Sequence, residues 1–352
     1  MQVHIDRLLK EMAEARNLMC KAQEGENFMQ EKKRVEGDLM SIDGFTTCIK
    51  MDIKKELGSR YTLEVKDITK NNDTRLKGLI IMEQGSNMHP TIYMESFYEQ
   101  YKAGGTLEEI KDSILQTFQE SRAGKQLDVA FFADWKKVKE RVTYKLINLE
   151  RNWELLKDVP HKKFLDLAIV YECFLGMGNA GGVVILIHDS HIKAWGVTVD
   201  ELHATALQNT PELMGYSLAS MTEVMQEIMG SGKAELDGIE DLPSREELEK
   251  DIFPMYVLTN HHKLHGAGCI LYKNLLQEIA EKWKCNLIIL PSSIHEVILI
   301  PMNKAGNYVE MAQIVREVNQ TQVMPEEVLS DHVYQFSSET GKIIMQEEEE
   351  YE

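Results

Sequence analysis

The segment from Asn286 to Pro301, NLIILPSSIHEVILIP, places two runs of branched apolar residues on either side of a short polar stretch. Continuous apolar runs, in contrast to alternating ones, are typical of strands that are buried on both faces. Pro291 ends the first run, because proline cannot donate a hydrogen bond to a strand ladder. Pairing of residues 286–290 with 296–300 would leave PSSIH as a five-residue hairpin loop, which is a common length. The segment therefore predicts a hairpin in a sheet that helices or a second sheet must cover.

The same order of two strands and one helix is expected three times along the chain. The three sets are RYTLEVKDI and LKGLIIME before TLEEIKDSILQTF, FLDLAIVYECFL and GGVVILIHD before TVDELHATALQN, and the hairpin above before NYVEMAQIVREVNQ. Thr106 with Glu109, and Thr198 with Glu201, have the spacing of a capping box, and Asn307 is expected to be an N-cap. The three sets share no sequence, so they are not a detectable repeat. We expect an α/β (α+β) fold, with mixed sheets built from three ββα-like units and covered by helices.

Apolar spacing predicts two further amphipathic helices. An N-terminal helix is expected over residues 3–22, and a second one over residues 135–149, where apolar residues recur every three or four positions. The stripe of the second helix consists of Trp135, Val138, Val142, Leu146 and Leu149. Its outer face would carry the densest basic cluster of the chain, namely Lys136, Lys137, Lys139, Arg141 and Lys145. Such a face is more often simply solvated than a docking surface for an acidic partner.

Composition shifts along the chain suggest four segments. We expect an N-terminal helical extension over 1–39, an α+β domain over 40–125, a larger α/β domain over 126–345, and an acidic tail over 346–352. Residues 230–251 are acidic, contain Gly, Ser and Pro, and lack apolar periodicity, which is typical of a linker or mobile loop within the larger domain.

Charge and cysteine usage limit the possible environments and partners. The 352 residues carry a net charge of −18, which disfavours a nucleic-acid-binding protein, since gripping phosphates needs a concentrated basic surface. No apolar run is long enough to span a membrane, and the N-terminus lacks the apolar core of a secretory signal. The five cysteines are widely spaced and include no CxxC pair, which favours a reducing compartment. We therefore expect a cytoplasmic protein with no membrane contact.

The glycine pattern GMGNAGG matches a dinucleotide-binding fingerprint in letters but not in context. Gly176, Gly178 and Gly181 satisfy GxGxxG, yet that fingerprint needs a helix to begin at the glycines. The apolar run VVILIH follows instead and predicts a strand. We expect a hairpin loop here and no nucleotide cofactor.

The polar turn of the opening segment contains residues that could support hydrolysis. Ser293 and His295 could approach each other across the loop, with Asp331 or His332 as a third partner, in an arrangement of nucleophile, base and orienting group. Alternation along the strand places Glu296 on the opposite face from His295. A polar turn that fixes strand register is the alternative for the same residues.

Histidines gather in two short segments. His188 and His191 lie in HDSH, and His261 and His265 lie in TNHHKLHG, with spacings of three and four residues that could serve zinc. No acidic or histidine partner stands at a diagnostic spacing. We expect no metal, and these four histidines are the candidates if one binds.

Other polar residues at predicted strand ends, and one methionine stripe, are candidates for binding. Loops and strand ends are where binding residues concentrate, which points to Ser292, Thr259 and Asn260. Met221, Met225 and Met229 share one face of the segment SMTEVMQEIMG, and methionine faces can form adaptable binding surfaces, although packing in a core is their commoner use.

Five separated blocks of the sequence resemble an uncharacterised family. They are GSNMHPTIYMESFYEQYKAGGTLEEI, RVTYKLINLERNWELLKDVPHKKFLDLAIVY, MYVLTNHHKLHGAGCILY, LPSSIHEVILIP and VNQTQVMPEEVLSDHVYQF. In this order they resemble a domain-of-unknown-function family of cytoplasmic proteins from Gram-positive anaerobes, over about residues 40–342. The resemblance implies an α/β architecture and brings no activity.

We expect a binding or regulatory protein without catalysis, whose ligand is a protein partner or a small molecule. The alternatives are a hydrolase using Ser293, His295 and Asp331, and a histidine-based metal-binding protein. The sequence leaves the oligomeric state open.

Overall fold

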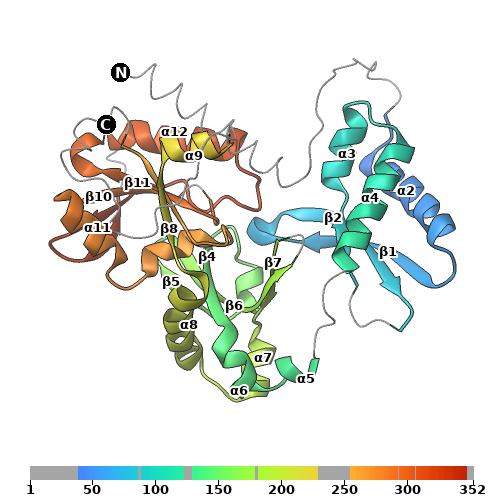
Figure 1. Ribbon diagram of the computed structural model, residues 1–352, viewed down its shortest axis with the longest axis horizontal. Coiled ribbons are helices and arrows are strands. Elements are labelled where there is room, and N and C mark those ends of the chain that lie inside the picture. Colours follow the sequence, from blue (N-terminus) through green and yellow to red (C-terminus); the bar gives the residue numbers. More distant parts are fainter. Residues whose placement is uncertain are drawn as a thin grey trace. The chain divides into compact units, whose positions relative to one another are not determined.

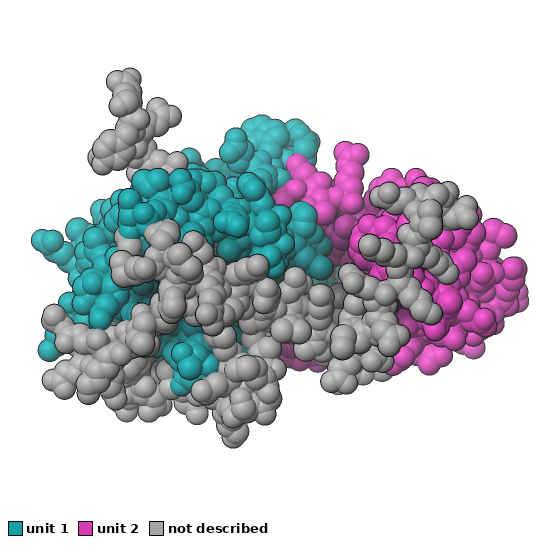
Figure 2. All heavy atoms as spheres, turned by 90° about the horizontal axis from the view of Figure 1, so that it is seen from above, with its two compact units in different colours: residues 1–26, 133–175, 184–352 teal, residues 27–132, 176–183 magenta. Residues whose placement is uncertain are grey.

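The computed structural model describes residues 39–85, 89–122, 129–178, 181–228, 254–291, 293–305 and 307–346 (Figure 1). The chain divides into two compact units, which Figure 2 colours separately. The described part of the smaller unit lies within residues 39–132 and 176–183, and that of the larger unit within 133–175 and 184–346. The N-terminal helix expected over 3–22 and the acidic loop over 230–251 lie outside the described residues.

The smaller unit is one antiparallel sheet covered by helices. Its elements are α2 (Ile42–Leu57), β1 (Tyr61–Thr69), β2 (Arg75–Glu83), β3 (Thr91–Tyr93), α3 (Glu95–Lys102), α4 (Leu107–Arg122) and α5 (Val129–Phe132), and the sheet has the order β1-β2-β3. Alternate residues of β1 and β2, such as Leu63, Leu79 and Ile81, face a core that also contains Phe45 of α2 and Ile114 of α4. The capping box of Thr106 and Glu109 is confirmed, since each backbone N–H is bonded to the other side chain.

The larger unit contains two antiparallel sheets. The first has β4 (Val142–Asn148), β5 (His161–Phe164), β6 (Leu167–Gly178) and β7 (Gly181–Leu186), with β6 paired to the other three. The ends of β6 and β7 within residues 176–183 are assigned to the smaller unit. The second has β8 (Ser217–Ser220), β9 (Tyr256–Thr259), β10 (Leu287–Leu290), β11 (Val297–Pro301), β12 (Tyr334–Ser337) and β13 (Lys342–Met345), in the order β13-β12-β10-β11-β9-β8. The helices are α6 (Trp135–Val138), α7 (Asp189–Trp195), α8 (Val199–Met214), α9 (Met221–Ile228), α11 (Leu275–Trp283) and α12 (Tyr308–Thr321).

The expected α+β class is confirmed, and each predicted pair of strands precedes its predicted helix. However, β3 and α3 stand between β2 and α4, and α7 stands between β7 and α8. The described strand pairs are antiparallel, which differs from the mixed sheets that we expected. The glycines around 176–181 join β6 to β7 and begin no helix. Among the described residues, no helix combines the length and the apolar character needed to cross a membrane.

The predicted hairpin is present with a register that differs by two residues. Leu290 pairs with Ile298, whereas a five-residue loop would have paired it with Glu296. The segment between β10 and β11 does not continue their pairing, because it makes its own contacts with residues 327–330, including a bridge between Ser293 and Val328. A shift of two residues keeps every side chain on its expected face, since side chains alternate with period two.

The prediction of a helix over residues 135–149 is wrong beyond Val138. α6 ends at Val138, a 3-10 turn follows at 139–141, and β4 then runs through the rest of the segment. Val142, Thr143, Tyr144 and Ile147 are β-branched or aromatic, and β4 is buried on both faces between β6 and α8, so packing overrides the helical spacing. Lys145 therefore does not lie on a solvated helix face.

Residues 266–283 form two separate helices. A 3-10 helix covers Gly266–Leu271, and α11 begins only at Leu275 after Asn274 takes up a left-handed backbone with φ 65°. Asparagine tolerates this conformation better than most residues, so the break is locally encoded. Leu275, Ile279 and Trp283 of α11 face the core, and Trp283 is 1% exposed.

Candidate functional site

A loop at residues 260–266 follows β9 and is shaped by one asparagine side chain. Asn260 donates through Nδ2 to the Leu264 carbonyl at 2.6 Å, and its Oδ1 accepts the backbone N–H groups of His262 and Leu264 at 3.0 and 3.2 Å. The backbone is left-handed at Lys263 (φ 51°) and His265 (φ 54°), a conformation that costs a non-glycine residue free energy. The Asn260 hydrogen bonds hold the loop in this shape.

Gly266 fits the end of the loop because it lacks a side chain. A Cβ atom there would lie 2.2 Å from Thr259 Oγ1 and 2.5 Å from the His295 carbonyl oxygen. Thr259 in turn donates its hydroxyl to that same carbonyl at 2.7 Å. The loop is thus pressed against the segment that joins β10 to β11.

His265 joins the loop to the buried carboxylate of Glu172. Glu172 of β6 is 2% exposed, and its two oxygens lie 2.6 Å from Lys145 Nζ and 2.8 Å from His265 Nδ1. Glu172 lies opposite Thr143 in the pairing of β6 with β4, and Lys145 follows two residues later on the same face of β4. We call Lys145, Glu172 and His265 the Glu172 cluster.

The electrostatics of the Glu172 cluster favour an ionised carboxylate. Burial alone would raise the pKa of Glu172, but the attraction of His265 and Lys145 and the hydrogen bonds from both hold this pKa well below its usual value. Burial lowers the pKa of His265 by more than the attraction of Glu172 raises it. At neutral pH His265 is therefore an uncharged imidazole that donates its Nδ1–H to the carboxylate, and its charge attracts Glu172 only at lower pH, where the ring is protonated.

A second histidine stacks on the first. The rings of His265 and His295 lie 5.5 Å apart at an interplanar angle of 23°. His295 Nδ1 accepts the backbone N–H of His265 at 3.3 Å, so in the neutral ring Nε2 carries the proton, and Nε2 lies 3.6 Å from Glu327 Oε1. This hydrogen bond occupies the nitrogen that would otherwise act as a base toward the loop.

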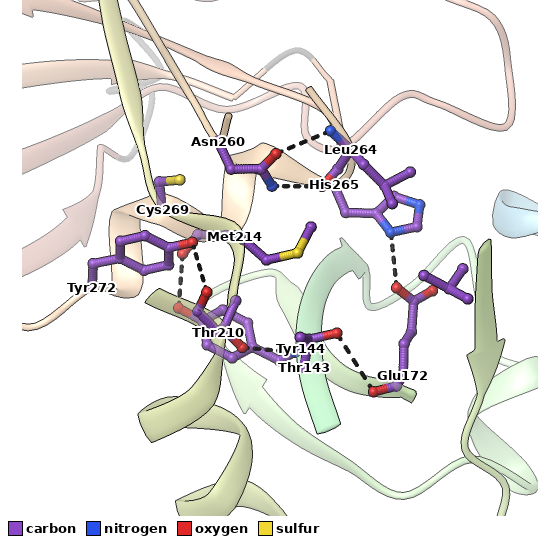
Figure 3. A pocket seen from close by; sticks show the side chains of 12 residues that line it. Thr143, Tyr144, Glu172, Thr210, Met214, Asn260, Leu264, His265, Cys269 and Tyr272 are labelled. Carbon is purple, nitrogen blue, oxygen red and sulfur yellow. Dashed lines mark hydrogen bonds and ion pairs between the residues drawn. The ribbon is translucent and has the colours of Figure 1, made fainter. Parts of the chain in front are cut away.

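A pocket lies between the Glu172 cluster and α8 and is shown in Figure 3, where His265 and Glu172 point toward one another. Its volume of about 10 Å³ is close to the space that one water molecule needs. Tyr144 closes it by donating its hydroxyl to the Gly268 carbonyl at 3.1 Å. Burial raises the pKa of the Cys269 thiol to about 12, so this cysteine stays protonated and is a poor nucleophile. The pocket can hold a single polar group and is too small for a whole substrate.

The structure does not join Ser293, His295 and Asp331 into a relay. Ser293 is 0% exposed, and its Oγ accepts the backbone N–H of His295 at 3.0 Å. Asp331 forms an ion pair with Arg151 and accepts a hydrogen bond from Asn319 Nδ2 at 2.8 Å. The contacts of Ser293 are those of a polar turn, and the acid expected as the third partner is engaged elsewhere.

The residues that the sequence predicts for binding lie in different places. Thr259 and Asn260 lie at the candidate site, where both shape the loop. Met221 is 7% exposed and packs in the core, whereas Ser292, Met229 and the side chain of Met225 lie outside what the structure describes. Of the methionine face, the structure describes only the side chain of Met221.

The four candidate metal ligands occupy two different places. His188 Nδ1 pairs with Asp158 at 3.0 Å, and His191 Nδ1 accepts the backbone N–H of His188 at 3.0 Å. His265 belongs to the Glu172 cluster, and His261 lies exposed near the loop tip. Among the described residues, no three histidine, cysteine or acidic side chains are grouped so that they could hold a metal ion.

Comparisons with known proteins give one match. No curated protein and no solved structure is similar to the chain at a significant level. A family model described as a family of unknown function (DUF5688) matches residues 42–338, which is most of the chain. The protein therefore belongs to the DUF5688 family of unknown function.

Proposed function

We propose that the protein is a non-catalytic binding or regulatory module whose recognition element is the loop 260–266. One observation carries this proposal, namely that a strained loop is fixed onto the buried Glu172 cluster. Left-handed residues such as Lys263 and His265 persist only where the surroundings determine them, and they collect at ligand clamps and binding loops. A polar cluster buried beneath such a loop can fix its shape even where it adds little stability.

The chemistry around the loop supports binding more than turnover. The pocket has room for about one water, the Ser293 hydroxyl is buried, and the Cys269 thiol stays protonated. A substrate would therefore find no cavity here and no accessible nucleophile among these residues. A partner that lays one polar group against the loop is compatible with all three observations.

The exposed part of the loop indicates the type of partner. His261 is exposed, and His262 and Lys263 are partly exposed. The net charge of −18 disfavours nucleic acid and leaves a protein or a small polar ligand as the occupant. A cytoplasmic location belongs to the same proposal, and free thiols at Cys48, Cys173, Cys269 and Cys285 support it.

Replacement of Asn260 by alanine tests the proposal. It removes three hydrogen bonds that shape the loop, so we expect the amount of cross-linked partner recovered from cells that produce the protein to fall roughly tenfold or more. Quantitative mass spectrometry of the wild-type and variant complexes is the measurement.

Asn209→Ala provides the matched control. Asn209 of α8 also donates to two backbone carbonyls, those of Lys139 and Val142, and neither belongs to the loop. Recovery by the control variant should match the wild type. Equal recovery of the same partner by Asn260→Ala would contradict the assignment of the loop.

A further inference from the structure

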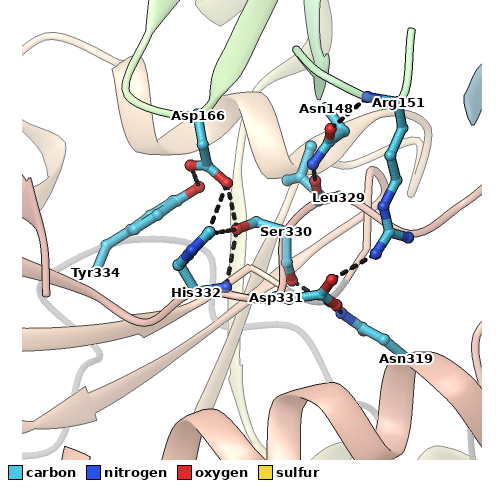
Figure 4. A network of polar contacts seen from close by, with 9 residues as sticks. All are labelled: Asn148, Arg151, Asp166, Asn319, Leu329, Ser330, Asp331, His332 and Tyr334. Carbon is cyan, nitrogen blue, oxygen red and sulfur yellow. Dashed lines mark hydrogen bonds and ion pairs between the residues drawn. The ribbon is translucent and has the colours of Figure 1, made fainter. Parts of the chain in front are cut away.

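A second polar network lies in the larger unit around Asp166, in the turn between β5 and β6 (Figure 4). Asp166 Oδ2 accepts the Ser330 hydroxyl at 2.7 Å, and Oδ1 accepts the hydroxyl of Tyr334. Ser330 and Tyr334 are both 0% exposed, and burial raises the pKa of Tyr334, so this phenol keeps its proton and remains a donor. Asp166 is therefore braced by two buried hydroxyl groups.

The braced carboxylate orients His332. The Nδ1 of His332 lies 3.1 Å from Asp166 Oδ2, and its backbone N–H donates to Ser330 Oγ at 3.0 Å. The side chain of His332 is 45% exposed and that of Asp166 19%. Because Nδ1–H is directed to the carboxylate, the lone pair of the neutral ring is on Nε2, to which no described residue is bonded.

The acid that serves this histidine is not the one nearest in sequence. Asp331, which precedes His332, is held by Arg151 and by Asn319. Asp166 comes from a turn more than 160 residues earlier. Asn148 and Asn319 hold the segment just before His332 by donating to the Leu329 and Ser330 carbonyls at 3.0 and 2.8 Å. The position of His332 relative to Asp166 is thus set by several hydrogen bonds.

The chain contains a natural comparison. His188 also presents Nδ1 to a carboxylate, that of Asp158, at 3.0 Å, and its side chain is 35% exposed. The Asp158 side chain is 72% exposed, and among the described residues no hydroxyl group braces it. The two histidines therefore share exposure and an acidic partner and differ in how firmly that partner is held.

We propose that His332 is a modification site whose Nε2 accepts an acyl group from small activated acyl donors. The Nε2 lone pair attacks the donor's carbonyl carbon, the new C–N bond forms, and the leaving group departs with the electron pair of its bond to carbon. The positive charge that develops on the ring is stabilised through Nδ1–H by Asp166, and loss of the Nδ1 proton to solvent then leaves a neutral N-acylimidazole. Compact donors fit best, because less than half of the His332 side chain is exposed, at 45%.

Reaction of the whole folded chain with diethyl pyrocarbonate at pH 8 tests the proposal. This reagent is an activated acyl donor, and its attack by Nε2 leaves an ethoxyformyl group on the ring and releases ethyl carbonate, which breaks down to ethanol and CO₂. Mass spectrometry of peptides taken at several times gives a rate for each histidine. We expect His332 to react roughly tenfold faster than His188, the effect of one well-oriented charge-assisted hydrogen bond.

Two variants test whether the rate at His332 depends on its orientation by Asp166 or only on the exposure of its ring. Asp166→Asn should lower the rate at His332 to about that of His188, whereas Asp158→Asn should leave the rate at His332 unchanged. Since Asp166→Asn could unfold the chain, Ser330→Ala, which removes only one brace, is measured beside it and should lower the rate by a smaller factor. Equal rates at His332 and His188 in the wild-type chain would overturn the proposal without any variant. An unchanged rate at His332 in both Ser330→Ala and a folded Asp166→Asn would overturn it as well.

Discussion

Replacing Lys145 with methionine is expected to lower the free energy of unfolding of the larger unit by about 3–5 kcal/mol at neutral pH. Lys145 Nζ lies 2.6 Å from a carboxylate that is 3% exposed, so the variant leaves Glu172 buried with only the neutral His265 as a partner. Urea unfolding followed by tryptophan fluorescence is a suitable measurement, because Trp135, Trp153, Trp195 and Trp283 all belong to the larger unit.

Two further variants make this result specific. Lys162 pairs with Asp200 at the surface, where the side chains are 40% and 83% exposed, so Lys162→Met should cost at most about 1 kcal/mol. The double variant Lys145→Met with Glu172→Gln should recover part of the loss, because no charge is then left unpaired. A similar small effect of Lys145→Met and Lys162→Met would show that the Glu172 cluster is not buried as described.

Replacing Gly266 with alanine should destabilise the larger unit by about 1–3 kcal/mol. The added methyl group would meet Thr259 Oγ1 at 2.2 Å, and it would also meet two backbone atoms, the His295 carbonyl oxygen at 2.5 Å and the Asn260 nitrogen at 2.7 Å. Backbone atoms cannot turn aside as a flexible side chain can, so the loop must shift. The same urea midpoint detects the change.

Gly44→Ala is the control for this substitution. A Cβ at Gly44 would meet only Ser41 Oγ at 3.5 Å and Met40 Cβ at 3.6 Å, and alanine is favoured over glycine inside a helix such as α2. We expect unchanged unfolding of the larger unit in this variant. Full stability of Gly266→Ala would mean that the loop is not pressed against His295.

Most of the fold follows from local sequence signals. The capping boxes of Thr106 and Thr198 mark their helices correctly, because the hydrogen bonds involved join residues three positions apart. The hairpin of β10 and β11 follows from its apolar runs. The apolar residues of β4 also fit helical spacing, so the sequence pattern predicts a helix there. Its burial between β6 and α8 is what favours a strand.

The candidate site could be predicted only in part, because its residues come from distant positions. The sequence predicts Thr259 and Asn260 as binding residues at strand ends, His295 as a catalytic candidate and His265 as a metal candidate. Glu172 was missed although it carries a signal, since a single acid inside the apolar run LAIVYECFL must find a cation if it is buried. Which cation it finds depends on the register of β4 against β6, and that register follows from tertiary packing.

The pairing of Asp166 with His332 shows the same limit. The sequence offers Asp331 and His332 only as alternative third partners for Ser293 and His295, and it predicts no pairing of His332 with an acid. In the structure Asp331 is held by Arg151 and Asn319, and the acid beside His332 comes from a distant turn. Composition and spacing cannot supply such an arrangement.

The ionisation of Glu172 is the claim on which the site depends, and a ¹³C NMR titration of the labelled glutamate side-chain carboxyl groups measures it directly. Glu172→Gln assigns the signal. Because His265 and Lys145 lower the pKa of Glu172, we expect this signal to keep the chemical shift of a carboxylate at pH 7 and to remain unchanged as the pH falls through 4.5, where exposed glutamates become protonated. A signal that titrates at or above 4.5 in the folded protein would contradict the account.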